Sequence, residues 1–540
     1  MNKKTNWLSL LATALLLPAC GSSSSSKEHY SDSDGTDGLV YELNEEKNGY
    51  IVTASLTPEK EIKIPELYQG LPVREIGDEA FMYEEIDSLS LPRSLRKIGR
   101  RAFFNLSDEG ELKEIDVPEG VTSIGEEAIA ECYGLTSIGL PSTLKEIGES
   151  AFALDTSLQR FRLPKENHYF ELKGSILYSE DFKILYTYPL DAGYTAVDIP
   201  EEVEEIKPFA FYGDSAITSF EIGKNVKKIG DRALGAMRAL TSMNAKRATS
   251  LTTLGEGVFR ENSKLTSIEL PSTIQEFGPN LFAKDTLLAS VKLNFDYDEI
   301  PEGMFLNCGS LTSLTPLPDQ LTSIGDDAFS GCSRLSELNF PSSLKRIGES
   351  AFVHTALETV NLPEGLEEIG KSAFRNCTAL KKITLPSTLT SLGEASFGYI
   401  TTLTEADCSK IKITDIPDSC FAGDSALTSL SLPSALTSIG AHAFQGTAIP
   451  SIELPDGFKK LGEYAFYDAP ALSKVFIPAS TEFIGVLALV KTGPVGNPPE
   501  VYFEASSFVN EDKTEGEHYG EVNHSDHVHF STTREAFHSL

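Results

Sequence analysis

The stretch LTSIGLPSTLKEIGESAFALDTS, residues 135–157, decides the fold, because close copies of it recur along the chain. Two of these copies are LSELNFPSSLKRIGESAFVHTA (335–356) and LKKITLPSTLTSLGEASFGYITT (380–402). Alignment of the copies on their Ile-Gly step gives about seventeen units, with a commonest spacing of about 23 residues. A fixed period of this length is typical of solenoids. The repeat therefore predicts one array of stacked turns.

Each unit holds two short apolar patterns, for example LTSIELP (265–271) and IQEFGPNLF (274–282). In LTSIELP, residues 265–271, the apolar residues are Leu265, Ile268 and Leu270. The last two alternate with Glu269, as in a short strand, and the proline that follows ends the strand because it has no N–H. The Gly of the Ile-Gly step is expected to permit a tight bend with unusual dihedral angles. The AFxxC segment is expected to be a short helical or irregular turn that carries an inward Phe.

A single turn of this kind cannot bury its own apolar face. Ordering the backbone costs roughly 1–2 kcal/mol per residue, whereas burial of one Leu, Ile or Phe returns about 1.5–3 kcal/mol. Neighbouring turns must therefore cover each other, which gives a continuous core. With strands about 4.8 Å apart, seventeen turns extend about 80 Å. We expect an elongated, curved, β-rich solenoid.

The composition limits the partners. The 540 residues include 79 acidic and 46 basic side chains, and the net charge is −33. Such an excess repels phosphate groups, so nucleic acid is not expected as a partner.

The N-terminus has the features of a targeting segment. MNKK supplies positive charge and WLSLLATALLLPAC a short apolar run. The run ends in Leu17-Pro18-Ala19-Cys20, which resembles a bacterial lipoprotein signal. Residues 1–19 would be removed and Cys20 would carry the lipid anchor to a membrane. An ordinary signal peptide cut nearby is the alternative.

The repeat resembles the leucine-rich repeat of the BspA-like bacterial surface lipoproteins. IPELYQGLPVREIGDEAF, residues 64–81, is similar to that family's opening unit, and GSILYSEDFKILYTYPLDAGYTAVDIPEEVEEI, residues 174–206, to a hairpin-bearing insert found there. The resemblance covers roughly residues 39–490. It implies a leucine-rich-repeat solenoid displayed outside the cell that adheres to host matrix proteins or neighbouring cells.

These observations divide the chain into five segments. After the signal, residues 20–38 form a Ser-rich flexible tether. Residues 39–70 form an N-terminal cap, in which LVYELNEEKNGYIVTASL predicts a hairpin around Lys47-Asn48-Gly49. The solenoid spans 71–490 with the hairpin insert at about 165–200, and 491–540 form a C-terminal cap and a polar, His-rich tail.

Two enzyme-like motifs fall inside the repeat. GLEEIGKS, residues 365–372, matches a phosphate-binding loop, but the slot of Lys371 holds Glu349 and Asp326 in sibling units. GESAF at Gly148 and at Gly348 resembles a nucleophile elbow but has Phe in place of the final Gly. We therefore expect no nucleotide, no cofactor and no enzymatic activity.

One slot, three residues after the Phe or its substitute, holds small polar or sulfur-containing side chains. We expect them to form a ladder of hydrogen bonds to neighbouring loop backbone. Free buried thiols are the favoured interpretation, and a disulfide between Cys308 and Cys332 stays open. The slot contains Cys132, Asn262, Asp285, Cys308, Cys332, Thr355, Cys377, Asp424 and Thr447.

The tail concentrates histidines. His518, His524, His527 and His529 lie within a short polar segment and could ligate Zn²⁺ or Ni²⁺ as neutral imidazoles. The favoured interpretation is a polar tail that binds metals only weakly. We therefore expect no dedicated metal site.

The candidate binding face is a column of outward residues, one from each strand, expected on the concave side of the solenoid. The column is polar, and no His, Asp and Ser converge on it from matching slots. No cluster of aromatic side chains marks a hot spot, although Phe476 is an aromatic exception that is expected to be exposed. The insert and the terminal hairpin are competing sites. The column comprises Glu269, Lys292, Thr315, Asn339, Asn361, Thr384, Asp407, Ser431, Glu453 and Phe476.

The first functional hypothesis is a non-enzymatic adhesion or protein-interaction lipoprotein at the bacterial outer membrane or cell surface. It would present the solenoid to host matrix proteins or neighbouring cells. The alternative is a surface lipoprotein that captures glycans or nutrients through Tyr178, Tyr186 and Tyr188 of the insert. The sequence leaves the identity of the ligand open.

Overall fold

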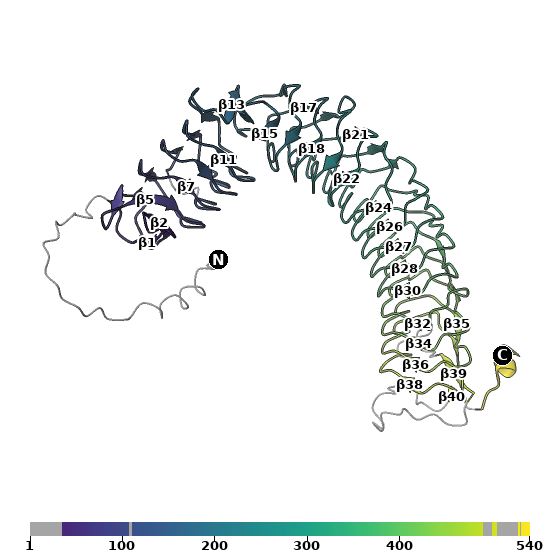
Figure 1. The fold of residues 1–540 in the computed structure, drawn as a ribbon. Helices are drawn as coiled ribbons and strands as arrows, with labels where there is room; N and C mark the ends of the chain where they lie inside the picture. The colour runs from purple at the N-terminus through teal and green to yellow at the C-terminus, as the bar shows by residue number, and fades with distance from the viewer. Residues whose placement is uncertain (1–34, 107–110, 490–498, 505–527, 530, 540) are drawn as a thin grey trace, which may run out of the picture.

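The computed structural model describes residues 35–106, 111–489, 499–504, 528–529 and 531–539. It is a solenoid of about 19 turns, close to the expected number, and its turns follow one arch (Figure 1). β1 (Leu39–Leu43) and β2 (Tyr50–Ser55) open it as an antiparallel hairpin, which confirms the predicted N-terminal hairpin. α1 (Arg534–Ser539) is the one α-helix among the described residues.

One set of strands, here called the inner ladder, ends at the Ile of the Ile-Gly step or at its substitute, except that the strand from the insert runs two residues past this position. Its sheets contain up to seven strands, and the strands pair in parallel from turn to turn. Its members are β5 (Leu71–Ile76), β7 (Lys97–Ile98), β9 (Ser123–Ile124), β11 (Glu146–Ile147), β15 (Ile184–Thr187), β16 (Glu205–Ile206), β18 (Lys228–Ile229), β20 (Thr253–Leu254), β22 (Glu276–Phe277), β24 (Glu299–Ile300), β26 (Ser323–Ile324), β27 (Arg346–Ile347), β28 (Glu368–Ile369), β30 (Ser391–Leu392), β32 (Asp415–Ile416), β34 (Ser438–Ile439), β36 (Lys460–Leu461) and β38 (Phe483–Ile484).

The second set, here called the outer strands, carries the Leu-x-x-Ile-x-Leu pattern and pairs in shorter groups of two to four. Its members are β3 (Glu61–Lys63), β6 (Ser88–Ser90), β8 (Glu114–Asp116), β10 (Ser137–Gly139), β12 (Arg160–Arg162), β17 (Ser219–Glu221), β19 (Ser242–Asn244), β21 (Ser267–Leu270), β23 (Ser290–Leu293), β25 (Ser313–Leu314), β29 (Lys382–Thr384), β31 (Glu405–Asp407), β33 (Ser429–Ser431), β35 (Ser451–Glu453), β37 (Lys474–Ile477), β39 (Glu500–Phe503) and β40 (Val528–His529).

The Gly of the Ile-Gly step is required by close packing between turns. A Cβ atom on Gly393 would lie 2.3 Å from the backbone nitrogen of Lys371, and one on Gly370 would lie 2.6 Å from that of Glu349. The expectation of unusual dihedral angles at this Gly is wrong. The left-handed conformation falls two residues later, where Ser372 has φ 55° and Ala395 has φ 53°.

The predicted inward Phe is confirmed. The AFxxC segments are irregular turns, and their Phe side chains stack along the core with ring centroids 5.2–5.6 Å apart and nearly parallel planes. Such stacking adds to the free energy of burial. The column contains Phe259, Phe282, Phe305, Phe329, Phe352, Phe374, Phe397, Phe421, Phe444 and Phe466.

The slot after the Phe forms the expected ladder. The Cys308 thiol donates to the carbonyl of Phe282 at 3.0 Å, and the Asn262 amide donates to the carbonyl of Leu234 at 2.9 Å, in both cases in the preceding turn. Each bond satisfies a buried backbone carbonyl. Cys308 and Cys332 are free buried thiols in the structure.

The insert interrupts the core. β13 (Phe170–Lys173) and β14 (Ile176–Ser179) form an antiparallel hairpin, and β14 pairs with β15. Residues of β14 alternate between two cores: Leu177 packs into the N-terminal one, and Ile176 and Tyr178 into the C-terminal one. A further short strand, β4 (Leu67–Tyr68), lies at the N-terminal end and pairs with β5.

Candidate functional site

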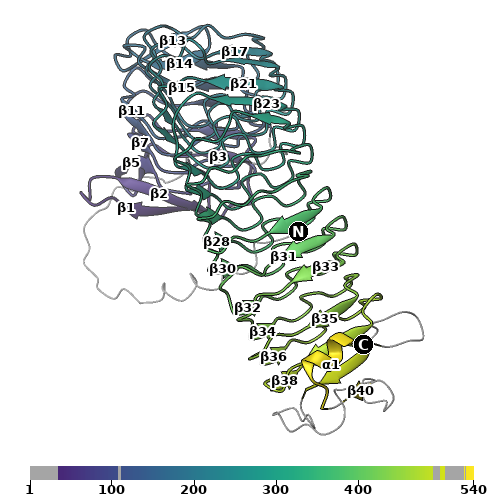
Figure 2. The same cartoon turned by 90° about the vertical axis from the view of Figure 1, so that its right-hand side faces the viewer.

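The predicted binding column lies on the convex side of the arch, so the expectation of a concave position is wrong. Figure 1 shows the inner ladder, with β22 to β38, along the inside of the curve, and Figure 2 shows β31, β33 and β35 on the opposite, outer side. The close approach of turns at the Ile-Gly step shortens the inner side. The outer strands are spread and pair in separate groups.

The residues of the predicted column lie along the outer strands and the matching turns between them. Where outer strands pair, its members are neighbours in register: Glu269 lies beside Lys292, and Asp407 lies between Thr384 and Ser431. Nine of the ten residues are exposed or half-buried. The pKa of Asp407 is held below its usual value by hydrogen bonds from Ser409. A polar column of this kind presents hydrogen-bonding groups to a partner at intervals of one turn.

Phe476 is the exception, because it is fully buried. The C-terminal segment folds back over it: the ring of Phe537 lies 5.3 Å from that of Phe476, and the guanidinium of Arg534 lies 4.7 Å above the same ring. Arg534 also bonds to Glu453. The interpretation of Phe476 as an exposed aromatic is therefore wrong.

A carboxylate of the column takes part in this contact. The imidazole of His538 lies 2.7 Å from the second carboxylate oxygen of Glu453. Burial opposes ionisation of Glu453, but hydrogen bonds from His538 and Arg534 hold its pKa below the usual value. Two of the ten column residues are thus covered by the C-terminal segment of the chain.

The histidine cluster is only partly placed. His518, His524 and His527 lie outside the described residues. His529 belongs to β40, where its imidazole bonds to Glu500 at 2.6 Å and stacks on Tyr502 at 4.7 Å. Within the ranges that the structure describes, no group of three His, Cys, Asp or Glu side chains is placed to hold a metal ion.

The concave face is formed by the two residues before each Ile-Gly step. Threonine hydroxyls bridge successive turns, as where Thr252 donates to the carbonyl of Lys227 at 3.2 Å. Ion pairs do the same: Lys345 lies 3.1 Å from Glu367. Sequence reasoning missed this face, although the regular polar pair before every Ile-Gly step could have identified it.

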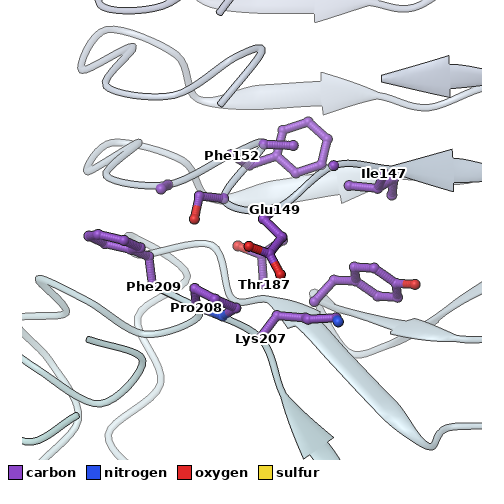
Figure 3. A pocket seen from close by; sticks show the side chains of 12 residues that line it. Ile147, Glu149, Phe152, Thr187, Lys207, Pro208 and Phe209 are labelled. Carbon is purple, nitrogen blue, oxygen red and sulfur yellow. The ribbon is translucent and has the colours of Figure 1, made fainter. Parts of the chain in front are cut away.

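A small cavity marks the place where the insert enters the ladder (Figure 3). It has a volume of about 100 Å³, enough for several water molecules, and Glu149, Thr187 and Lys207 line it. By the register of β15, β16 and β18, Tyr186 and Lys207 occupy the position of the Gly of the Ile-Gly step here. The cavity contains no nucleophile paired with a base.

The tyrosines of the insert do not form an exposed sugar-binding platform. Tyr178 and Tyr188 are buried, and burial raises the pKa of both well above the usual range. Only Tyr186 is half-buried, beside the cavity. Two of the three side chains proposed for glycan capture are thus inaccessible for stacking on a sugar.

The two enzyme-like motifs are parts of the scaffold. Lys371 is an exposed side chain whose ammonium group lies 2.9 Å from Glu394, and this hydrogen bond raises the pKa of Lys371. The residues directly after it, 372–376, form a turn and not the start of a helix. Ser150 and Ser350 occupy the left-handed position of their turns, with φ 55° and 54°.

The cysteines of the core are unreactive for a physical reason. Burial raises the pKa of Cys332, Cys377 and Cys408 to about 12. A thiol with such a pKa is protonated at neutral pH and is a poor nucleophile. Cys20 lies outside the described residues.

Among the described helices and strands, no helix is long and apolar enough to cross a membrane.

Comparison with known proteins identifies the repeat. The family model described as "BspA type Leucine rich repeat region" matches residues 74–178, 190–312, 298–428 and 414–492, which is more than half of the chain. A search of the curated proteins finds no match.

Solved structures with similar turns include three bacterial proteins. A leucine-rich repeat protein from Eubacterium ventriosum is 21% identical with a TM-score of 0.42, and the match covers 60% of this chain and 73% of that one. The pneumococcal vaccine antigen PcpA is 18% identical with a TM-score of 0.42, covering 62% and 92%. A leucine-rich repeat protein from Bacteroides ovatus is 23% identical with a TM-score of 0.33, covering 86% and 93%.

Proposed function

Because the chain belongs to the BspA type leucine-rich-repeat family, we propose that it is a non-enzymatic adhesion and protein-interaction lipoprotein. It presents the solenoid to extracellular proteins, either host matrix proteins or proteins of neighbouring cells. Leucine-rich-repeat arrays are binding scaffolds whose partners contact many turns at once.

The observation that carries the proposal is the regular exposure of polar side chains on both sides of the arch. Polar neighbours such as Glu269 and Lys292 lie side by side where outer strands pair, and Thr hydroxyls and ion pairs bridge successive turns of the inner ladder. Contacts that are individually weak add along such an array, because each further contact is intramolecular once the first has formed.

The proposal includes attachment to the cell surface. Cys20, at the end of the apolar run, would carry the lipid, and residues 20–38 would hold the solenoid away from the bacterial outer membrane or cell surface. Treatment of intact cells with protease, followed by blotting for the chain, tests this exposure. Protection of the whole chain in intact cells would contradict the surface location.

Binding is tested with purified full-length chain, with Cys20→Ser to prevent lipidation. We expect saturable binding to at least one protein of an extracellular matrix panel by surface plasmon resonance. An unrelated leucine-rich-repeat protein of similar net charge is the control. Responses no larger than those of the control across the panel would contradict the adhesion function.

A further inference from the structure

The outer strands are interrupted in the middle of the arch. β25 ends at Leu314, and the next outer strand, β29, begins at Lys382. Between them, the turns at 335–341 and 357–363 contain no strand. Figure 2 shows the arrows of β21 and β23 above this interval and those of β31 and β33 below it.

Two features of the sequence accompany the interruption. Pro316 stands where other turns have a backbone N–H that bonds to the next turn. The unit that follows is one residue short, because four residues separate Phe352 from Leu357 where five separate Phe329 from Leu335. The strand segment at 357–362 follows this short unit directly.

The interruption leaves backbone groups without their usual partners. In regular turns, Thr136 N–H donates to the carbonyl of Lys113 at 2.8 Å, and Val117 N–H donates to that of Gly139 at 2.9 Å. The equivalent groups are Lys381 N–H with the Glu358 carbonyl, and Leu362 N–H with the Thr384 carbonyl. Neither bond is made between these described residues.

A groove separates the two turns at this point. Its volume is about 510 Å³, within the range of about 300–1,000 Å³ that is usual for ligand sites. The apolar part of its lining is Val360, Leu362 and Pro386, and Asn361 and Thr384 of the predicted column also line it. We call it the outer groove.

Charged side chains stand on both walls of the outer groove. Glu358 is exposed on one wall and Lys381 on the other, and neither forms an ion pair with a described residue. The next lysine, Lys382, is paired with Glu405 at 2.6 Å. Glu364, a further exposed carboxylate of the lining, accepts hydrogen bonds from Ser387. Glu358 and Lys381 are therefore the charges of the lining that have no hydrogen bond or ion pair to a described side chain.

The chain itself provides a precedent for strand addition to an outer strand. β40 adds in parallel to the edge of β39, with Val528 beside Val501 and His529 beside Tyr502. An unpaired strand edge binds extended polypeptide in this way in many complexes.

We propose that the outer groove binds an extended segment of the partner protein, whose backbone bonds to the free groups of Glu358, Leu362, Lys381 and Thr384. The inference rests on the proposed interaction function and names its site. The segment carries an acidic side chain toward Lys381 and a basic one toward Glu358, with small or β-branched residues over Val360 and Leu362.

Insertion of one residue tests the role of the groove. A Gly inserted between Thr355 and Ala356 restores the usual length of the short unit and lets the turns pair. A Gly inserted between Thr447 and Ala448 is the matched control, because that unit has the same deletion but does not line the outer groove.

The probe is a yeast-displayed library of random eight-residue peptides, selected on the full-length chain. We expect selected peptides to bind the 355 insertion at least tenfold more weakly and the 447 insertion within twofold of the wild type. A library without enriched clones, or clones that bind all three proteins equally, would overturn the proposal.

A charge-reversal variant tests the groove even if the insertion variant does not fold. Lys381→Glu changes an exposed side chain, so the turn itself is expected to remain folded. Lys381→Glu should weaken the binding of acidic peptides at least tenfold, and replacement of their acidic residue by Lys should restore binding. If acidic peptides bound Lys381→Glu as tightly as they bind the wild type, the proposed orientation of the segment would be wrong, and with it the assignment of the groove as the binding site.

The same variants separate this inference from the adhesion function. A matrix protein that binds the wild type and the 355 insertion equally leaves the adhesion function standing and removes the groove as its site. If selected peptides depend on the groove but no matrix protein of the panel binds, the groove stands as a binding site and the adhesion function is contradicted.

Discussion

Glycine at the Ile-Gly step shows how a single residue sets the spacing of the turns. At Gly393 any side chain would meet the backbone of the preceding turn, at Lys371 N and Gly370 C. The backbone conformation at this step is one that every residue can adopt. The left-handed position, Ser372, is the reverse case, because it has room for a side chain but an unfavourable φ.

Substitutions at these two positions give the first prediction. Gly393→Ala should destabilise the chain by about 1–3 kcal/mol, because the added methyl group forces the turns apart. Ser372→Gly should leave stability unchanged or raise it by up to about 1 kcal/mol, because Gly tolerates a positive φ. Thermal unfolding followed by circular dichroism measures both. Equal destabilisation by the two substitutions would contradict the packing argument.

The buried aspartates of the slot after the Phe are the second residue-scale feature. At Asn262, Oδ1 accepts from the backbone of Met237 and Nδ2 donates to the carbonyls of Leu234 and Phe259. Asp285 occupies the same slot: its Oδ1 accepts from Asn262 at 2.7 Å, but its Oδ2 has no partner among the described residues. Burial raises the pKa of Asp285 well above the usual value. Burial therefore favours the protonated carboxyl over the carboxylate, and a protonated Oδ2 is a hydrogen-bond donor.

This makes stability depend on pH. Because the pKa is raised in the folded state, the contribution of Asp285 is complete below the usual Asp pKa of about 4 and is lost as pH rises through the folded value. Asp285→Asn supplies the donor at every pH. We expect it to raise stability at pH 8 by about 1–3 kcal/mol and to change it little at pH 4.

Melting temperatures at pH 4 and pH 8 measure the effect. Asp319→Asn, at an exposed loop position, is the control and should have no effect at either pH. If Asp285→Asn lowered the melting temperature at pH 8, the assignment of a protonated carboxyl would be wrong.

At the scale of the element, unit length decides where outer strands pair. The short unit before Leu357 lies in the interval without outer strands between β25 and β29, and the equally short unit before Ile449 separates β33 from β35. The inner ladder continues through both places, because its register is set at the Ile-Gly step. A unit that is one residue short thus disturbs the pairing of the outer strands but not that of the inner ladder.

The C-terminal helix is the second feature at this scale. Phe537 of α1 packs against Phe476 and Tyr502, and these three rings form a small cluster separate from the main core. The contact covers an apolar patch that would otherwise be exposed on the outer face.

Removal of this ring is the third prediction. Phe537→Ala should detach α1, because the cluster loses one of its three aromatic rings. Hydrogen exchange of β37 should accelerate, while the melting temperature of the solenoid stays within about 2 °C of the wild type. Glu535→Ala, on the exposed side of α1, is the control. Unchanged exchange in β37 would show that α1 does not protect this strand.

These elements show what the sequence alone could and could not predict. The period, the hairpin at 39–55 and the inward Phe column follow from local patterns and are confirmed. The side on which each set of strands lies depends on the distance between turns, which the pattern does not contain. The burial of Phe476 depends on Phe537, a residue far away in the sequence. The outer groove needed a comparison of unit lengths and of unmade backbone bonds.

At the scale of the whole molecule, the chain is an arch with two different sides. The inner side is a nearly continuous ladder of short strands, and the outer side is divided where units are short, at the proline or at inserts (Figure 1). Because each turn contacts mainly its neighbours, stability is approximately a sum over turns. Loss of a complete turn should therefore be tolerated far better than a smaller deletion that breaks register.

The most direct test of the continuous array of stacked turns is the thermal unfolding of two deletion variants. Deletion of residues 325–347, one complete unit of 23 residues, joins Ile324 to Gly348 and preserves both ladders. Deletion of residues 325–336, only 12 residues, leaves a half unit that cannot pair on either side. If the chain is a continuous array of stacked turns, the larger deletion should retain cooperative unfolding with a melting temperature near that of the wild type, and the smaller should lose several degrees or fail to fold. Equal damage by both deletions, or greater damage by the complete unit, would contradict the stacked array.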